Sequence, residues 1–203
     1  MRRHVGLTEK RMANRRFRKT EEAILKVFFE GDYFIGVEKV AKKVGVARST
    51  IYNHHRAVKE ILPDYEKYVM RKYERMLRSL VKNNKVRLRA IYFRLLIFIL
   101  QEKKIFLMLV KNHHEMIIGK MMLRLEPRIS AHAKLPKNSG RILMIYIGEV
   151  MSVIGEWMQN GFSEEGINGV LDDIMFLTDT MRVRLNGLRK YDEAGVEKCV
   201  RKV

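Results

Sequence analysis

Apolar residues recur along this chain at every third or fourth position, which is the spacing of helices that bury one face. No stretch alternates apolar and polar residues with the period of two that a half-buried strand requires. Prolines occur only at positions 63, 127 and 136, so the composition allows long helices through most of the chain. We therefore predict an all-α protein.

The first part of the chain is expected to hold short helices and one long helix. The pattern predicts a helix over 20–30 with Thr20 as its N-cap, two short helices within 37–56, and a long charged helix over about 63–82. Residues 11–20 contain five basic side chains and no acidic one, so we expect a solvated arm there. A domain boundary is expected near residues 83–84.

The second part of the chain is more apolar, and its predicted helices are longer. We expect helices over 86–104, 105–125 and 141–161, and a last helix that is capped by Ser163 and ends in a charged, frayed tail from about Asn186. Residues 125–140 contain two prolines, a glycine and several polar residues, so they predict a loop.

The net charge of the chain limits the classes of partner that it is expected to bind. The 203 residues carry a formal net charge of +18, and residues 1–56 contain 14 Lys or Arg against 6 Asp or Glu. Such a surplus attracts polyanions, either nucleic acid or an anionic membrane surface. The single cysteine, Cys199, allows no disulfide within the chain, and no signal peptide is visible. The most apolar run, residues 90–100, is too short to span a bilayer, so we expect a cytoplasmic protein.

Residues 37–56 (VEKVAKKVGVARSTIYNHHR) carry the pattern that is most informative about function. Four apolar residues fall at i, i+3, i+4 and i+7 of a first short helix: Val37, Val40, Ala41 and Val44. Gly45 follows, where a helix end favours a residue that can take a positive φ. A second short helix is expected from about Ala47, with Val46 and Ile51 as its inward anchors.

The polar residues of this second helix are expected to face outward, and all of them can form hydrogen bonds: Arg48, Ser49, Thr50, Asn53 and His54. A buried first helix followed by a polar, basic second helix is typical of the helix-turn-helix motif, which inserts its second helix into the major groove of DNA.

Residues 16–62 resemble the DNA-binding domain of the tetracycline-repressor (TetR) family of bacterial transcription regulators. The resemblance is carried by Gly31-Asp32-Tyr33, Val40-Ala41, Gly45-Val46 and Ile51-Tyr52-Asn53-His54, and by KEIL at 59–62. It implies a homodimeric regulator, usually a repressor, with a basic arm (1–15), a helix-turn-helix DNA-binding domain (16–62), a connecting helix (63–84), an effector-binding and dimerisation domain (85–190) and a charged tail (191–203).

The chain departs from the family pattern at several positions. Ile35-Gly36 replaces the usual hydroxyl residue that donates to a DNA phosphate, so backbone N–H groups at Gly36 and Val37 would make that contact. His55 stands where an aromatic residue is usual, and Lys59 lies one position later than the usual lysine. Pro63 interrupts a helix that is continuous in the family, so we expect a kink or a restart there.

The expected DNA contacts divide into those that read bases and those that position the protein. The base-reading candidates are Arg48, Ser49, Thr50 and Asn53. By resemblance to the family, phosphates would be held by Tyr52 and His54, and Lys59 is a further candidate. The minor groove or the backbone would be reached by Arg15, Arg16, Arg18 and Lys19. For each of these arm residues, the alternative is a merely solvated face.

The last two helices would form the dimer interface that the resemblance implies. A strip of small residues in helix 141–161 allows close approach of a second helix, and the candidate interface comprises Gly148, Ser152, Gly155, Ile147, Met151, Ile174 and Met181. A helix crossing within the chain is the alternative. The methionine-rich second half also suits a pocket for an apolar effector. Its candidate lining is Phe106, Met116, Met121, Met144, Tyr146, Met151 and Trp157, unless these residues simply fill the core.

The sequence shows no catalytic or metal-binding pattern. The pairs His54-His55 and His113-His114 are adjacent, so on a helix their side chains diverge by about 100° and cannot chelate one ion together. We therefore expect no enzyme, no metal and no cofactor. The rival to a DNA-binding regulator is a basic membrane-surface or scaffolding protein that docks through the apolar residues 86–125.

Overall fold

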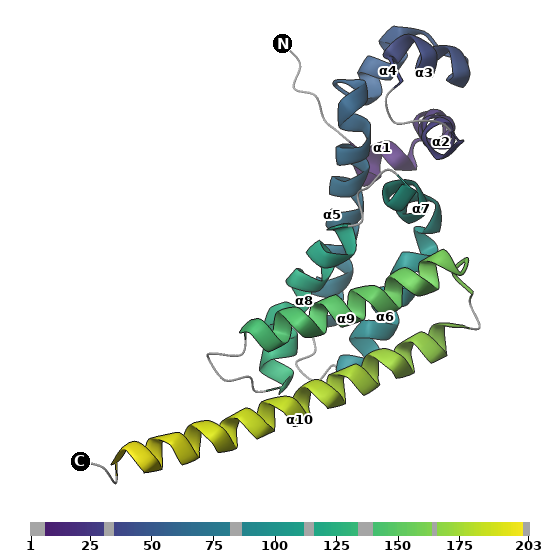
Figure 1. The fold of residues 1–203 in the computed structure, drawn as a ribbon. Coiled ribbons are helices and arrows are strands. Elements are labelled where there is room, and N and C mark those ends of the chain that lie inside the picture. Colours follow the sequence, from purple (N-terminus) through teal and green to yellow (C-terminus); the bar gives the residue numbers. More distant parts are fainter. Residues whose placement is uncertain are drawn as a thin grey trace. The chain divides into compact units, whose positions relative to one another are not determined.

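The computed structural model describes residues 7–30, 35–81, 87–111, 116–133, 140–163 and 166–200, with side chains for all of these except 29, 81, 116, 128, 130–133 and 187–200. Within these ranges every regular element is a helix and none is a strand (Figure 1), so the all-α prediction is confirmed.

The chain divides into two compact units, residues 1–79 with 102–117, and residues 80–101 with 118–203. The helices of the first unit are α1 (Glu9–Ala13), α2 (Arg15–Glu30), α3 (Val37–Val44), α4 (Arg48–His54), the short 3-10 helix η1 (Val58–Glu60), α5 (Ile61–Val81, to Ser79) and α7 (Lys103–Lys111). Its core is built from fully buried apolar side chains of α2, α5 and α7, among them Ile24, Phe28, Leu62, Val69 and Phe106.

The basic segment that we expected to be a solvated arm is helical. Asn14 caps α2, because its side-chain oxygen accepts the Phe17 backbone N–H at 3.1 Å. Thr20, the predicted cap, lies inside α2 and donates its hydroxyl to the Arg16 carbonyl at 3.3 Å. The helix therefore begins at Arg15 rather than at Thr20, since a polar capping residue and not the apolar pattern sets its start.

The boundaries of α3 and α4 agree with the prediction from the sequence. Gly45 ends α3 with a left-handed φ of 75°. The backbone N–H groups of Gly45 and Val46 both donate to the Ala41 carbonyl, at 2.9 and 3.0 Å, which satisfies the helix end. Ala47 then precedes α4, and Ile51 is buried as the inward anchor of that helix.

The helix α5 begins at Ile61, directly after η1. Pro63 thus occupies the first turn of α5, where its missing N–H removes no bond within the helix. A restart of the helix near this proline is what the sequence predicts.

The segment 102–117 packs with the first unit, although the sequence places it in the C-terminal domain. The predicted helix over 86–104 is interrupted at Glu102, which separates α6 (Leu88–Gln101) from α7. A nearly continuous apolar pattern shows that a segment is buried, but it does not show against which helices.

The second unit consists of α6, α8 (Met116–Ala133, from Ile118 on), α9 (Gly140–Gln159) and α10 (Gly166–Val200). The predicted loop over 125–140 is wrong in its first part, because α8 continues through Pro127 to Ala133. Leu125 and Ile129 are completely buried while Pro127 is exposed, so the apolar face continues past a proline that points to solvent.

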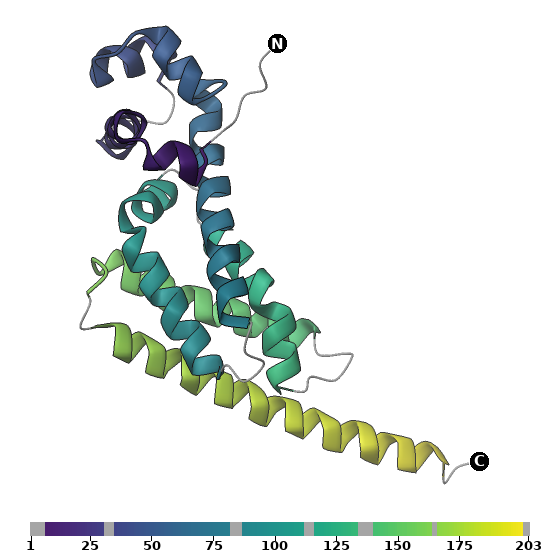
Figure 2. The same ribbon diagram turned by 180° about the vertical axis from the view of Figure 1, so that it is seen from behind.

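The helices α9 and α10 pack along each other (Figures 1 and 2). Gly161 follows α9 with a φ of 88°, and the Ser163 hydroxyl accepts the Gly166 N–H at 3.2 Å, so the predicted cap of α10 is present. Inside the unit, the Tyr146 hydroxyl lies 2.6 Å from that of Tyr92 and 2.8 Å from that of Thr178. The last helix continues to Val200, although the sequence predicts a frayed tail from about Asn186.

Among the described residues, α9 is the one helix whose length and composition would suffice to cross a membrane. Leu143, Val150 and Ile154 of α9 are buried inside the second unit. The central helix of a water-soluble bundle meets the same criterion, so this is weak grounds for a membrane location.

Candidate nucleic-acid interface

The exposed side of α4 carries most of the residues predicted to read DNA. Arg48, Ser49 and Asn53 are exposed, and Thr50 is half-buried. Tyr52 keeps 50 % of its surface accessible, so its ring and hydroxyl are open to a binding partner. Ile51 on the opposite side is 1 % exposed, so α4 has one buried side and one polar side.

His54 does not belong to the exposed side of α4, contrary to the prediction. It is 6 % exposed, its Nδ1 lies 2.5 Å from Oε1 of Glu21, and its ring stacks on Phe17 with centroids 4.0 Å apart. The reason is the helix period, because residues three apart share a face and His54 follows the inward anchor Ile51 by three. The spacing alone could have shown this.

A buried polar network fixes the end of α4 to α2 and α5. Both ring nitrogens of His55 are engaged, Nε2 with Oε2 of Glu21 at 3.1 Å and Nδ1 with Oδ2 of Asp64 at 3.0 Å. The Tyr65 hydroxyl donates to Oε2 of Glu21 at 2.7 Å. Glu21 and His55 are completely buried, so these hydrogen bonds replace the contacts with water that each group loses on burial.

The protonation of this network follows from its contacts. Burial raises the pKa of Glu21, but hydrogen bonds from His54, His55 and Tyr65 outweigh it and bring the pKa to about 2. Burial lowers the pKa of His55, but its hydrogen bonds to Asp64 and Glu21 raise it above the ordinary 6.5. The raised pKa of His55 favours its protonated form beside the Glu21 carboxylate, at a position that the sequence marked only as a departure from the family pattern.

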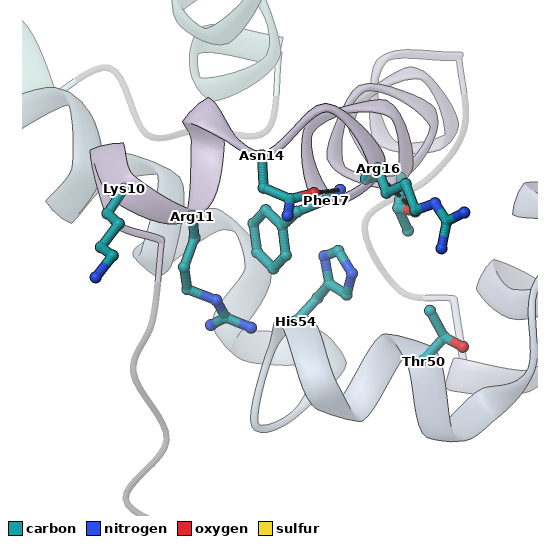
Figure 3. A pocket seen from close by; sticks show the side chains of 8 residues that line it. Lys10, Arg11, Asn14, Arg16, Phe17, Thr50 and His54 are labelled. Carbon is teal, nitrogen blue, oxygen red and sulfur yellow. Dashed lines mark hydrogen bonds between the residues drawn. The ribbon is translucent and has the colours of Figure 1, made fainter.

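A cavity of about 540 Å³ opens beside α4 (Figure 3). Its lining includes Lys10 and Arg11 of α1, Arg16 and Phe17 of α2, and Thr50 and His54 of α4. Arg11 reaches across to α4, since its Nη2 donates to the Asn53 carbonyl at 2.6 Å and its guanidinium lies 4.3 Å from the centre of the Phe17 ring.

The short helix α1 is fastened to α5 at its other end. Glu9 forms an ion pair with Arg75, and the Leu7 carbonyl accepts a hydrogen bond from Arg71. Leu7 itself is completely buried. The segment that the sequence treated as an arm is therefore a structured part of the first unit, and sequence reasoning missed Lys10, Arg11 and Phe17.

The other predicted DNA contacts lie on the surface of the first unit. Arg48 pairs with Glu38 at 2.6 Å and Arg18 pairs with Glu22 at 3.7 Å, and both pairs are exposed. Such exposed pairs contribute little and can be exchanged for a phosphate. The remaining members of the set are exposed, apart from the half-buried Val37: Arg15, Lys19, Gly36, Val37 and Lys59. Gly36 is the N-cap of α3, and no described side chain caps it.

The residues predicted to line an effector pocket lie in different surroundings, and they belong to both units. Tyr146 and Trp157 are buried, and each uses its polar group inside the second unit, Trp157 by donating Nε1–H to the Ser163 carbonyl at 3.0 Å. Met144 is 57 % exposed. The others are placed as follows: Phe106 buried in the first unit, Met121 buried in the second, Met151 half-buried, and the side chain of Met116 outside the described residues.

The predicted strip on α9 is open toward the described residues of this chain. Gly148 and Ser152 are exposed and Gly155 is half-buried, and a Cβ added at either glycine would meet no atom within 4 Å. Among the described residues, no helix crosses closely at Gly148 or Gly155. Three residues of the predicted interface are instead buried in the chain's own core: Ile147, Ile174 and Met181. Large apolar side chains that α9 and α10 do expose are Met144, Ile145, Phe176 and Val183.

Within the described residues, no group of three or more His, Cys, Asp or Glu side chains could hold a metal ion. The pair His113-His114 lies outside those residues. Comparison with known proteins adds no relative, because no family model, no curated protein and no solved structure matches the chain.

Proposed function

We propose that this protein is a sequence-specific, DNA-binding transcription regulator of the TetR type, which places α4 in the major groove. The observation that carries the proposal is the two-sided character of α4. Ile51 is buried against its own unit, while Arg48, Ser49 and Asn53 face outward behind a tight turn at Gly45. A short helix presented in this way matches the dimensions of the groove.

In this proposal the residues of α4 divide their roles. Arg48 exchanges Glu38 for a guanine edge, and Ser49 and Asn53 contact neighbouring bases. The Tyr52 hydroxyl donates to a backbone phosphate. His54 and His55 contact no DNA but hold α4 at a fixed angle through Glu21 and Asp64.

Operator recognition in this class requires two copies. The open strip on α9 and the exposed Phe176 of α10 favour a homodimer that forms through these two helices, because exposed apolar side chains mark contact surfaces. Two-fold symmetry would set two copies of α4 roughly 34–36 Å apart over a palindromic site. Repression, a cytoplasmic location and control by a small effector in the second unit follow from the family resemblance.

The rival function is docking to a membrane surface through residues 86–125, where Phe93 and Leu123 are the exposed large apolar side chains among the described residues. Leu88, Ile91, Leu95 and Ile99 of α6 are all buried. Vesicle binding without duplex binding would nevertheless favour this rival.

The test of the proposed function is duplex binding by Tyr52→Phe, which keeps the ring and removes the hydroxyl. We expect about 10- to 100-fold weaker binding, since a hydrogen bond to a charged group contributes about 1.5–3 kcal/mol. Lys67→Ala, on the exposed side of α5, is the control and should bind as the wild type does. Equal affinities of all three proteins would count against a role for α4.

A further inference from the structure

The cavity beside α4 has aromatic walls that are already occupied. One face of the Phe17 ring stacks on His54, at 4.0 Å and with an interplanar angle of 6°, and the Arg11 guanidinium lies over the ring. Figure 3 shows the rings of Phe17 and His54 together between Lys10 and Arg11 on one side and Arg16 and Thr50 on the other. The ring of a ligand therefore finds no free face on Phe17 for stacking.

What the cavity offers instead is positive charge without a matching acid. The side chains of Lys10 and Arg16 form no ion pair or hydrogen bond with any described residue, whereas Glu9 is taken by Arg75 and Glu22 by Arg18. Glu21, which contacts the cavity residue His54 from behind, is buried and engaged by both histidines. The unbalanced charge selects an anion.

The uncharged groups of the cavity select an anion with several oxygen atoms. Thr50 contributes a hydroxyl group and Asn14 its amide NH2, and both line the same cavity as the cations, whereas the Thr20 hydroxyl already donates to the Arg16 carbonyl. Arg11 is already oriented by the Asn53 carbonyl and the Phe17 ring, so little side-chain entropy is lost when it binds. Tetrahedral phosphate combines charge with acceptors that point in several directions.

We propose that this cavity binds a phosphate group, with Lys10 and Arg16 as the cations that hold it and Thr50 as a hydrogen-bond donor. The proposal deepens the proposed function and rests on it for the source of the phosphate, which is the DNA backbone beside the base pairs that α4 reads. Thr50 then positions α4 instead of reading a base. The alternative source of the same chemistry is a free phosphorylated molecule.

The first arm of the test measures the salt dependence of binding to a mixed-sequence duplex, which needs no knowledge of the operator. Each phosphate contact contributes about 0.9 to the slope of log K against log salt. The double variant Lys10→Gln/Arg16→Gln should lose about one unit of slope and bind about tenfold more weakly. The matched control Lys67→Gln/Arg78→Gln removes two exposed cations of α5 and should leave the slope unchanged.

The second arm titrates pyrophosphate into the free protein and follows the ring resonances of Phe17 and His54 by NMR. We expect a saturable shift in the wild type and in the α5 control, and none in the Lys10→Gln/Arg16→Gln variant. Pyrophosphate binding with an unchanged duplex slope would support the cavity with a free phosphorylated molecule as its source. No shift and no change of slope would overturn the proposal.

Failure of the proposed function would look different. A wild-type protein that binds all duplexes equally, without sequence preference, contradicts the proposed function as a sequence-specific regulator. The salt-dependence slope and the pyrophosphate titration still test whether the cavity binds phosphate.

Discussion

Glu21 accepts hydrogen bonds from three side chains that belong to two other helices. His54 and His55 reach it from the end of α4 and Tyr65 reaches it from α5. Local sequence signals do not mark this arrangement, because Glu21 looks like an ordinary acidic residue in the first turn of a helix that was expected to start at Thr20. Its neighbour Glu22 is the acidic residue that lies on the surface, with 66 % of its side chain accessible.

Replacing Glu21 by Ala should destabilise the first unit strongly. The change leaves a buried His55 charge and two other donors without their acceptor, a loss on the order of 3–5 kcal/mol. Urea unfolding measures the effect, and Glu22→Ala is the control. Because the Arg18–Glu22 pair is exposed, its loss should cost less than about 1 kcal/mol. Similar losses in both variants would contradict the buried network.

The stability of the first unit should fall at both low and high pH. Glu21 has a pKa of about 2 against an ordinary 4.5, so its contribution is complete above pH 4.5 and is lost as the pH falls toward 2. His55 has a raised pKa, so its contribution is complete below 6.5 and is lost as the pH rises through the raised value. Unfolding followed from pH 2 to 9 should therefore show a maximum between 4.5 and 6.5. A flat profile that Glu21→Gln does not alter would disagree with this assignment.

At the scale of the helices, local signals predicted some boundaries well and others poorly. Gly45 and the apolar spacing of Val40 and Ala41 define α3 and the start of α4, because these signals act within a few residues. The start of α2 depends on the Asn14 side chain, and the course of α8 past Pro127 depends on burial of Ile129. Both of these depend on three-dimensional packing or on a polar cap that the apolar pattern does not mark.

The cap of α2 provides a direct comparison of sequence and structure. Asn14→Ala should destabilise the first unit by about 1 kcal/mol, because it removes the acceptor of the Phe17 N–H. Thr20→Ala should cost clearly less, since the Thr20 hydroxyl only bonds back to the Arg16 carbonyl within the helix. Thermal unfolding of the two variants distinguishes them, and a larger loss for Thr20→Ala would restore the sequence-based assignment.

At the scale of the whole molecule, the sequence predicted an all-α chain and two units, but not which segments form them. Residues 102–117 belong to the first unit, because α7 supplies buried residues such as Phe106 to the core around α2. The strip on α9 was predicted from spacing alone, and its surroundings at Gly148 and Gly155 are open toward the described residues. The prediction of an effector pocket rested on composition and not on a regular spacing of residues.

The open strip leads to a prediction about assembly. Gly148→Arg combined with Phe176→Lys should give a monomer on sedimentation without loss of helix content, because both positions are exposed and position 148 has free space. Leu123→Lys, at an exposed apolar position of α8, is the control and should sediment as the wild type does. A wild-type monomer would contradict the homodimer, and a variant that still forms dimers would place the interface elsewhere.

The central claim is that the exposed side of α4 reads a DNA sequence. The most direct measurement is selection from a library of random duplexes by the wild type and by Arg48→Ala, followed by sequencing of the bound pool. We expect a palindromic sequence in the wild-type pool. For Arg48→Ala we expect a loss of preference at one base pair of each half-site, which corresponds to about 1–3 kcal/mol of discrimination. A wild-type pool without any enriched sequence, or an identical motif in both pools, would contradict this claim.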